Sequence, residues 1–169
     1  MITQQDREIV RRAYNQRCGY CGVREEEAGS ELEIDHFRPR SVGGGDEPEN
    51  LVYCCTACNR LKGDFWPASG SATHRRLLHP RRDDPTTHLR EEADDRLTAL
   101  TETGAFHLEH LRLNRSPLIA LRRARLESAQ LQQNLNELQS EQAQLREQLA
   151  ARDEEIREIL EQLARLLER

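Results

Sequence analysis

Two pairs of cysteines, each separated by two residues, constrain this chain more than any other feature of its sequence. Cys18 and Cys21 form the first pair, and Cys55 and Cys58 form the second. Two intervening residues place both sulfur atoms of a pair on one tight turn, where they bind the same tetrahedral ion. Two such pairs predict a closed four-cysteine zinc site that stabilises the fold and offers no open position for catalysis. Free core cysteines or redox-active pairs are the alternatives, and Cys54, the fifth cysteine, is expected to pack inward.

A metal site of this kind compensates for a shortage of large apolar side chains. Aromatic residues make up 4% of the 169 residues and charged residues 33%, which excludes a large core throughout the chain. The net charge of -5 excludes a globally basic nucleic-acid-binding protein, although not a local binding surface. No apolar run approaches the ~20 residues of a membrane span, and the first residues lack a signal-peptide pattern. We therefore expect a cytoplasmic protein with no membrane contact, in which paired cysteines bind metal rather than form disulfides.

The residues around the cysteine pairs predict an α+β arrangement. A capping-box pattern within the first six residues predicts an opening helix. Residues 32–36 and 51–54 are typical of short strands, and the glycine-rich segment 43–46 between them predicts an irregular loop. A second helix is expected over 56–66, so the order is strand, loop, strand, helix.

The remainder of the chain divides into an irregular extension and one long helix. We expect the domains to be 1–68, 69–115 and 116–169, with a hairpin in the extension that turns near Gly104. From residue 116 onward, apolar residues recur at alternating spacings of three and four, the heptad pattern of a coiled coil. These positions are Leu121, Ala124, Leu131, Leu135, Leu138, Leu145, Leu149, Ile156, Ile159, Leu163 and Leu166, interrupted by Ser128, Gln142 and Arg152. The pattern favours a homodimer or a partner protein, and the alternative is a monomer whose helix folds back on the extension.

Three short segments between residues 15 and 67 resemble the motif of the HNH endonucleases. They are Asp35–Ser41, Glu49–Val52 and Cys58–Gly63, and the two cysteine pairs frame them. The resemblance implies a small zinc-bound ββα-metal domain that hydrolyses phosphodiester bonds in DNA. It assigns Asn50 to bracing the loop that orients His36. Both later positions of the motif are asparagine here, which favours Mg²⁺ or Mn²⁺ over zinc at the reaction centre.

The chemistry of hydrolysis suits the residue types in these segments. A histidine titrates near neutral pH, so His36 is the candidate general base. Carboxylate and amide oxygens are ligands for hard divalent ions, so Asp35 and Asn59 are the candidate metal ligands. Neighbouring strand residues point to opposite faces, so Asp35 and His36 serve one phosphate only if the strand ends or twists there. The candidate phosphate contacts are Arg38, Arg40, Arg60 and Lys62. The non-catalytic alternatives are that Asp35 and His36 form a packing pair, that the two asparagines cap a helix or form a turn, and that the cations form surface ion pairs.

A weaker resemblance extends beyond the nuclease motif. The stretch from His79 through Asp83 to Arg115 is similar to the tail of bacterial stand-alone HNH proteins, some of which act beside an ATPase in phage defence. It implies a defence or restriction setting and an ATPase as a candidate partner. Two other classes remain open: a zinc-bearing module that binds nucleic acid without cutting it, and an interaction protein whose purpose is the coiled coil. The pairing of Asp35 with His36 favours the nuclease, because a binding module has no need of it.

Overall fold

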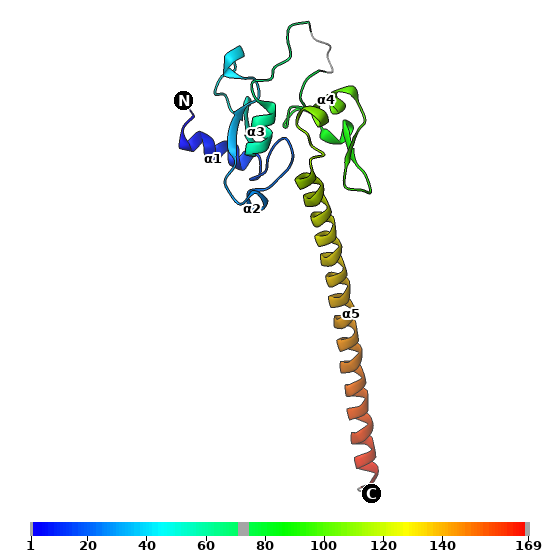
Figure 1. Ribbon diagram of the computed structural model, residues 1–169. Helices are drawn as coiled ribbons and strands as arrows, with labels where there is room; N and C mark the ends of the chain where they lie inside the picture. Colours follow the sequence, from blue (N-terminus) through cyan, green and yellow to red (C-terminus); the bar gives the residue numbers. More distant parts are fainter. Residues whose placement is uncertain (1, 71–74, 168–169) are drawn as a thin grey trace. The chain divides into compact units, whose positions relative to one another are not determined.

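The structure, a computed structural model, describes residues 2–70 and 75–167 of the chain. It is mixed α/β and divides into two compact units, Met1–Leu121 and Arg122–Arg169 (Figure 1). In chain order the elements are α1 (Gln4–Ala13), α2 (Glu25–Ala28), β1 (Glu33–His36), η1 (Arg40–Val42), β2 (Leu51–Cys54), α3 (Thr56–Lys62), η2 (Pro85–Thr87), β3 (Leu89–Glu91), β4 (Leu97–Ala99), α4 (Glu102–His110) and α5 (Ser116–Leu167).

Helix α1 begins at the capping box that the sequence predicts. The Thr3 hydroxyl accepts a hydrogen bond from the Asp6 backbone N–H, and the Asp6 carboxylate accepts one from the Thr3 backbone N–H. The two contacts satisfy backbone donors that have no partner within the first helical turn. The helix ends at Ala13, because Asn15 and Gln16 take positive φ values of 50° and 57° and turn the chain toward the first cysteine pair.

An antiparallel hairpin of β1 and β2 forms the centre of the first unit. Its register pairs Asp35 with Val52 and His36 with Leu51. All four residues of β2 are buried, because α1 packs against this strand and α3 lies against β1. Cys54 is fully buried at 0% exposure, which confirms the prediction that the fifth cysteine packs inward. The strand order and the following helix match the predicted strand, loop, strand, helix sequence.

Residues 75–115 contain more regular structure than the sequence suggests. Strands β3 and β4 form a two-stranded hairpin that turns at residues 92–96, where Asp95 takes a φ of 64°. The prediction of a turn near Gly104 was wrong, since Gly104 lies inside α4. A side chain there would collide with the backbone carbonyl of His88, so this glycine permits a close approach rather than a turn.

Side-chain hydrogen bonds hold this second hairpin and its flanking loop in place. The Asn114 amide donates to the Leu97 carbonyl (2.8 Å) and accepts from the Leu97 N–H (2.7 Å), which imitates one rung of a sheet. The Arg76 guanidinium makes two hydrogen bonds to Asp83, at 2.6 and 2.8 Å. Asp83 also accepts from the backbone N–H of His79 (2.7 Å). The extension is therefore part of the compact unit that ends at Leu121.

Helix α5 continues without a break from Ser116 to Leu167. Its first turns belong to the core of the first unit, where Leu118 is 4% exposed. Farther along, apolar side chains stand in solvent, with Leu131 69% exposed and Leu145 59% exposed. Of the helices that the structure describes, none is long and apolar enough to span a membrane.

A buried histidine in α4 makes a testable contribution to stability. His107 is 4% exposed, and its Nδ1 accepts a hydrogen bond from the Leu78 N–H (3.1 Å). Burial, aided by the nearby His110, lowers the pKa of His107 from 6.5 to about 4. The unfolded chain therefore takes up this proton at a higher pH than the folded protein does. The resulting stability is fully present above pH 6.5 and is lost as the pH falls from there toward about 4.

We expect the wild-type chain to lose about 2 kcal/mol more unfolding free energy than His107→Asn between roughly pH 7.5 and 5. Asparagine keeps a hydrogen-bond acceptor for Leu78 but carries no titratable group. Urea unfolding at a series of pH values measures this difference, and acid effects elsewhere act on both proteins. Parallel stability curves for the two proteins would show that His107 is not the group responsible.

Candidate functional site

The four cysteines of the two pairs come together in one cluster. Their sulfur atoms all lie within 4.8 Å of one another, and the Sγ atoms of Cys21 and Cys55 are 3.7 Å apart. A tetrahedral zinc ion with Zn–S bonds of ~2.3 Å places its sulfur ligands about 3.8 Å apart. The cluster thus fits the predicted ion in ligand type, number and spacing. Across residues 2–70 and 75–167, no second group of three or more histidine, cysteine or acidic side chains has this geometry.

Local backbone structure explains how each pair reaches the cluster. The first pair sits on a tight turn in which the Gly22 N–H donates to the Cys18 carbonyl (2.8 Å). Gly22 takes a φ of 71°, a conformation that glycine adopts at no steric cost. The second pair opens α3, where Cys55 is the N-cap and its sulfur accepts from the Cys58 N–H (3.5 Å). The cluster therefore joins the segment after α1 to the start of α3.

An arginine from the far end of the first unit completes the surroundings of the cysteines. The Arg115 guanidinium lies 3.5 Å from the Sγ atom of Cys58, 3.9 Å from that of Cys55 and 4.0 Å from that of Cys21. A zinc ion with four thiolates carries two net negative charges, and a cation in hydrogen-bond range of the sulfurs offsets them. Arg115 is also held by the Leu111 carbonyl (3.0 Å), so it ties the residues before α5 to the cluster.

His36, at the end of β1, meets a carboxylate from the glycine-rich loop. Its Nε2 lies 2.7 Å from Asp46 Oδ1 and 3.2 Å from Arg40 Nε. Arg40 also donates to the same Asp46 oxygen at 2.5 Å. The hydrogen bonds with His36 and Arg40 hold the pKa of Asp46 well below its usual range, so this carboxylate is ionised. The histidine, the arginine and the aspartate form one hydrogen-bonded group.

Asn50 braces the loop that carries this group. Its Oδ1 accepts from the Arg38 N–H (2.8 Å), while its Nδ2 donates to the carbonyls of Arg38 (3.1 Å) and Gly45 (2.8 Å). Gly44 must be glycine, because a Cβ there would overlap the Arg38 carbonyl. The loop therefore folds tightly around the Asn50 side chain, and its path brings Asp46 beside His36.

Asp35 lies in a different environment from His36, its neighbour in sequence. It is 8% exposed and accepts hydrogen bonds from the Tyr20 hydroxyl (2.6 Å) and Lys62 Nζ (3.0 Å). Burial raises the pKa of Asp35, while the hydrogen bonds from Tyr20 and Lys62 oppose that effect. Lys62 is only 2% exposed and also donates to the His36 carbonyl (2.7 Å). In place of the phosphate contact predicted for it, Lys62 ties α3 to β1.

Asn59, the second residue predicted to bind a divalent ion, also has a protein partner. Its Nδ2 donates to Glu33 Oε2 at 2.5 Å, and the same glutamate accepts from the Thr56 hydroxyl. Asp35 is thus paired with the ammonium group of Lys62, and Asn59 is hydrogen-bonded to the carboxylate of Glu33. An ion at Asp35 would lie beside the positive charge of Lys62. The two residues therefore do not fit a ready-made Mg²⁺ or Mn²⁺ site in this arrangement.

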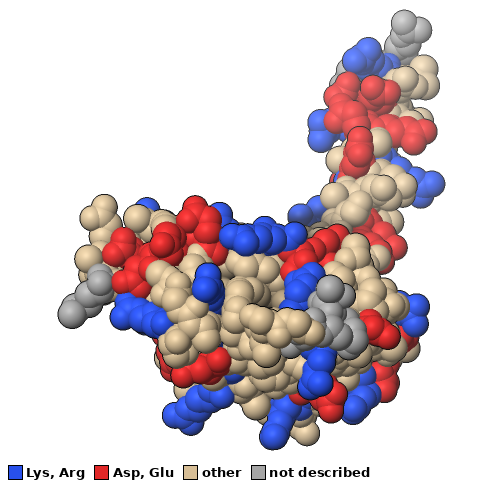
Figure 2. Space-filling model, turned by 90° about the horizontal axis from the view of Figure 1, so that it is seen from above, with Lys and Arg blue, Asp and Glu red and all other residues tan. Residues whose placement is uncertain are grey.

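The remaining cations predicted to bind phosphate lie at the surface. Arg38, Arg40 and Arg60 are all exposed. On the face shown in Figure 2, lysine and arginine side chains alternate with acidic ones, without one broad basic area. Any contact with nucleic acid on this face must therefore depend on a few placed arginines rather than on a general positive field.

Sequence reasoning missed three of the residues that organise the site. Asp46 follows three glycines in a segment that predicts only an irregular loop, and nothing there indicates that it returns to His36. Tyr20 lies between the first two cysteines, where it resembles a spacer. Arg115 falls within the stretch already noted for its similarity to HNH proteins, and that similarity was the available signal. None of the three contacts follows from a local periodicity.

Comparison with known proteins finds one matching family model and one similar protein. Residues 18–65 match the model of the HNH endonuclease family. The chain is also 26% identical over 141 residues to the Septu protein PtuA of Bacillus mycoides (strain KBAB4), an alignment that covers 68% of this chain and 20% of that protein. The chain thus spans about a fifth of the length of this relative. No solved structure matches the chain.

Proposed function

We propose that the protein is an endonuclease of the HNH type that hydrolyses phosphodiester bonds in DNA, with His36 as the general base. The observation that carries the proposal is the pairing of His36 with Asp46 beside Arg40, within the segment that matches the HNH family. A histidine fixed by a carboxylate next to a cation is the arrangement that activates water near an anionic substrate.

The contact with Asp46 favours one tautomer of His36. Arg40 donates toward Nε2 at 3.2 Å, whereas a carboxylate 2.7 Å away accepts a proton from that nitrogen. The shorter, charge-assisted contact favours the proton on Nε2 and leaves the lone pair on Nδ1. Nδ1 is then the atom that removes a proton from water. Asp46 acts as a positioning residue, since it sets the orientation and the tautomer of the base.

Arginine side chains supply the positive charge that the reaction requires. Attack on a phosphodiester builds negative charge on the phosphate oxygens, and guanidinium groups bind such oxygens in pairs. Arg40 is exposed and already fixed by Asp46, and Arg38 lies two residues from His36 in the loop braced by Asn50. We assign both to the scissile phosphate or its neighbour. Arg60, on α3, is a further candidate contact with the DNA backbone.

The proposal includes a dependence of DNA cleavage on Mg²⁺ or Mn²⁺, and an experiment can test this dependence directly. Binding at Asp35 and Asn59 would require Lys62 and Glu33 to move from their present partners. The test incubates the zinc-loaded protein with supercoiled plasmid, with no added divalent ion, with Mg²⁺ or with Mn²⁺, beside His36→Ala. We expect nicked and linear products from the wild-type chain and none from the variant. Intact plasmid under all three conditions contradicts the proposal.

One observation favours a second candidate function, a zinc-bearing module that binds nucleic acid without cutting it. The buried pairing of Asp35 with Lys62 and the hydrogen bond of Asn59 to Glu33 commit both predicted metal ligands to structural contacts. Such structural contacts are expected in a domain that retains the HNH fold but does not bind a catalytic divalent ion. DNA binding by the wild-type chain, without cleavage at any divalent-ion concentration, would select this function.

We further propose that α5 joins two copies of the chain in a parallel coiled coil. Isolated helices with an exposed apolar stripe are unstable in water, and the stripe residue Leu138 is 62% exposed. In a parallel pair, Glu141 of one helix faces Arg146 of the other, and Gln142 meets its own copy in the seam. The helix thus has the charges and the polar core residue that a symmetric partner requires.

The seam can be tested with a matched pair of substitutions. Leu138→Arg places a charge in the seam, whereas Ser140→Arg places the same side chain on the outer face. We expect Leu138→Arg to weaken the dimer by at least ~10³-fold, because two buried leucines are replaced per dimer. Light scattering over a range of concentrations measures the mass of each protein. A wild-type monomer, or equal masses for both variants, contradicts the coiled-coil homodimer.

The likeness to a Septu protein supports a phage-defence setting for this nuclease, as does the similarity of residues 79–115 to stand-alone HNH proteins. A partner protein, an ATPase among the candidates, would then bring the nuclease to its target. Such recruitment fits the net charge of -5 and the absence of a broad basic area on the face shown in Figure 2, because neither favours general attraction to DNA.

A further inference from the structure

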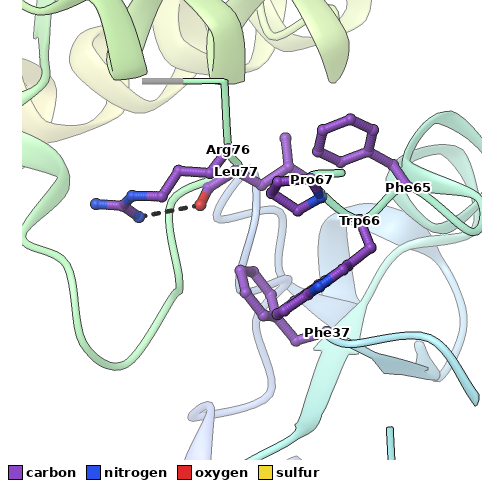
Figure 3. A pocket seen from close by; sticks show the side chains of 6 residues that line it. All are labelled: Phe37, Phe65, Trp66, Pro67, Arg76 and Leu77. Carbon is purple, nitrogen blue, oxygen red and sulfur yellow. Dashed lines mark hydrogen bonds between the residues drawn. The ribbon is translucent and has the colours of Figure 1, made fainter. Parts of the chain in front are cut away.

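A small apolar pocket lies beside the proposed catalytic loop. Its walls are Phe37, Phe65, Trp66, Pro67, Arg76 and Leu77, and its volume is about 170 Å³. In Figure 3 the rings of Phe37 and Trp66 lie together on the lower side, with Phe65 and Pro67 on the upper side. The rings of Phe37 and Trp66 meet edge to face, 6.1 Å between centroids. Trp66 is 38% exposed, so its ring is open to a binding molecule.

A wider groove beside the catalytic loop shares two of its walls with the pocket. Phe37 and Trp66 line both, and the groove, of about 480 Å³, is also lined by Arg38, Asn50 and Arg82. Phe37 and Arg38 directly follow His36 in the chain. The pocket and the groove thus lie next to the residues that directly follow His36, within reach of a polynucleotide strand whose phosphate is at His36.

Charge is arranged around the pocket rather than within it. Arg76 contributes to the wall, but its guanidinium is neutralised by the paired hydrogen bonds to Asp83. Arg38, which lines the neighbouring groove, has its guanidinium 5.7 Å from the centre of the Trp66 ring, a wall that the groove and the pocket share. Arg82 is exposed in the groove, opposed there by Glu47 and Glu49. An apolar aromatic interior with a cation beside one of its walls matches a flat, uncharged ring attached to a phosphate chain.

We propose that this pocket binds one unpaired nucleobase of the substrate, stacked on Trp66, while Arg38 contacts the adjoining phosphate. The proposal rests on the proposed function for the identity of the substrate as nucleic acid. A base held in a duplex is covered on both faces by its neighbours, so only a base that is already unpaired can enter. The substrate of the protein is thus nucleic acid with at least one unpaired nucleotide near the scissile bond. The guanidinium of Arg38 beside Trp66 favours this occupant over an apolar side chain of a partner protein.

Trp66 is the only tryptophan of the chain, so its fluorescence reports on the pocket directly. The experiment titrates full-length, zinc-loaded His36→Ala with a single-stranded oligonucleotide and with a blunt duplex of the same sequence. This variant blocks cleavage without a chelator that would remove zinc. Binding is followed in parallel by the anisotropy of a label on the DNA. We expect the single strand to quench the tryptophan emission by about half and the duplex to leave it unchanged.

Two substitutions at Trp66 in the same background test stacking against simple burial. Trp66→Phe keeps an aromatic face, and Trp66→Leu keeps only apolar bulk. We expect Trp66→Leu to weaken single-strand binding by about tenfold to a hundredfold, with Trp66→Phe in between and duplex binding unchanged. Thermal melting of each variant confirms that it folds. The fluorescence titration of the His36→Ala protein leaves the pocket residues unsubstituted, so it tests the pocket even if a Trp66 variant does not fold.

The outcomes separate the pocket from the nuclease activity. Unchanged emission at saturating single strand, equal quenching by duplex, or unaltered binding by Trp66→Leu overturns the pocket, even if the wild-type protein cuts DNA. Quenching by single strand, together with no cleavage by the wild-type protein, supports the pocket and refutes the nuclease. Absence of any DNA binding overturns both.

Discussion

Replacement of Cys58 by serine is expected to unfold the first compact unit of the protein. A structural zinc ion bound by four cysteines contributes ~10–16 kcal/mol at neutral pH, which equals or exceeds the whole stability of a small domain. Cys58 is fully buried, and its sulfur belongs to the cluster that joins the segment after α1 to α3. Loss of one ligand leaves the other three thiols, two of them buried, without their ion. Circular dichroism and native mass spectrometry should show an unfolded, zinc-free unit.

Cys54 provides the matched control for this experiment. It is adjacent to a proposed zinc ligand and is as deeply buried as Cys58, but its sulfur lies outside the cluster. Cys54→Ala removes one sulfur from the core and should cost no more than about 2 kcal/mol. That variant should retain one zinc ion per chain and a cooperative melting transition. A folded Cys58→Ser protein, or a folded wild-type protein that contains no metal, would refute the structural zinc site.

Replacement of His36 by alanine is expected to lower the cleavage rate by at least ~10²-fold while DNA affinity stays within a few-fold of wild type. The base removes a proton in the transition state and adds little to binding of the ground state. The measurement is single-turnover cleavage of a labelled oligonucleotide, with affinity determined separately. His88→Ala, which removes the histidine directly before β3 that hydrogen-bonds with Thr101, is the matched control and should cut at the wild-type rate. Equal rates for His36→Ala and the wild-type chain would falsify the assignment.

Substitution of Asp46 distinguishes a positioning residue from the base itself. Asp46→Ala removes the acceptor for His36 Nε2, and we expect a loss of about tenfold to a hundredfold, the usual effect of such supporting contacts. Asp46→Asn keeps an oxygen that can accept from Nε2–H and should recover part of that loss. A role in folding alone would instead lower the melting temperature of the Asp46→Ala protein in parallel with its cleavage rate, so thermal melting of both variants separates the two roles.

The sequence predicts the parts of the fold that local patterns determine. The capping box at Thr3, the strand over 51–54 and the long helix from residue 116 are all present. Each depends on periodicity or on residues within one helical turn, which a linear pattern contains. The four-cysteine cluster was also predictable, because the ligand spacing within each pair is local and the ion supplies the long-range contact.

The surroundings of the candidate site were less predictable, because they depend on contacts between distant segments. Asp46 reaches His36 through a loop whose path is set by Asn50, and Lys62 reaches Asp35 across two elements. The turn near Gly104 was wrongly predicted for a related reason. Glycine serves both turns and close approaches, and the carbonyl of His88 that decides between them lies 16 residues earlier in the chain.

The burial of Lys62 gives the protein an internal chemical reporter. It is the only lysine of the chain, and its ammonium is enclosed by Asp35 and the carbonyls of His36 and Gly63. Reagents that acylate amines should therefore leave every side chain of the folded protein unmodified. Acylation at Lys62 can occur only when α3 separates from β1. The rate of this single mass increase would measure how often the HNH-like segment opens, and whether bound nucleic acid keeps it closed.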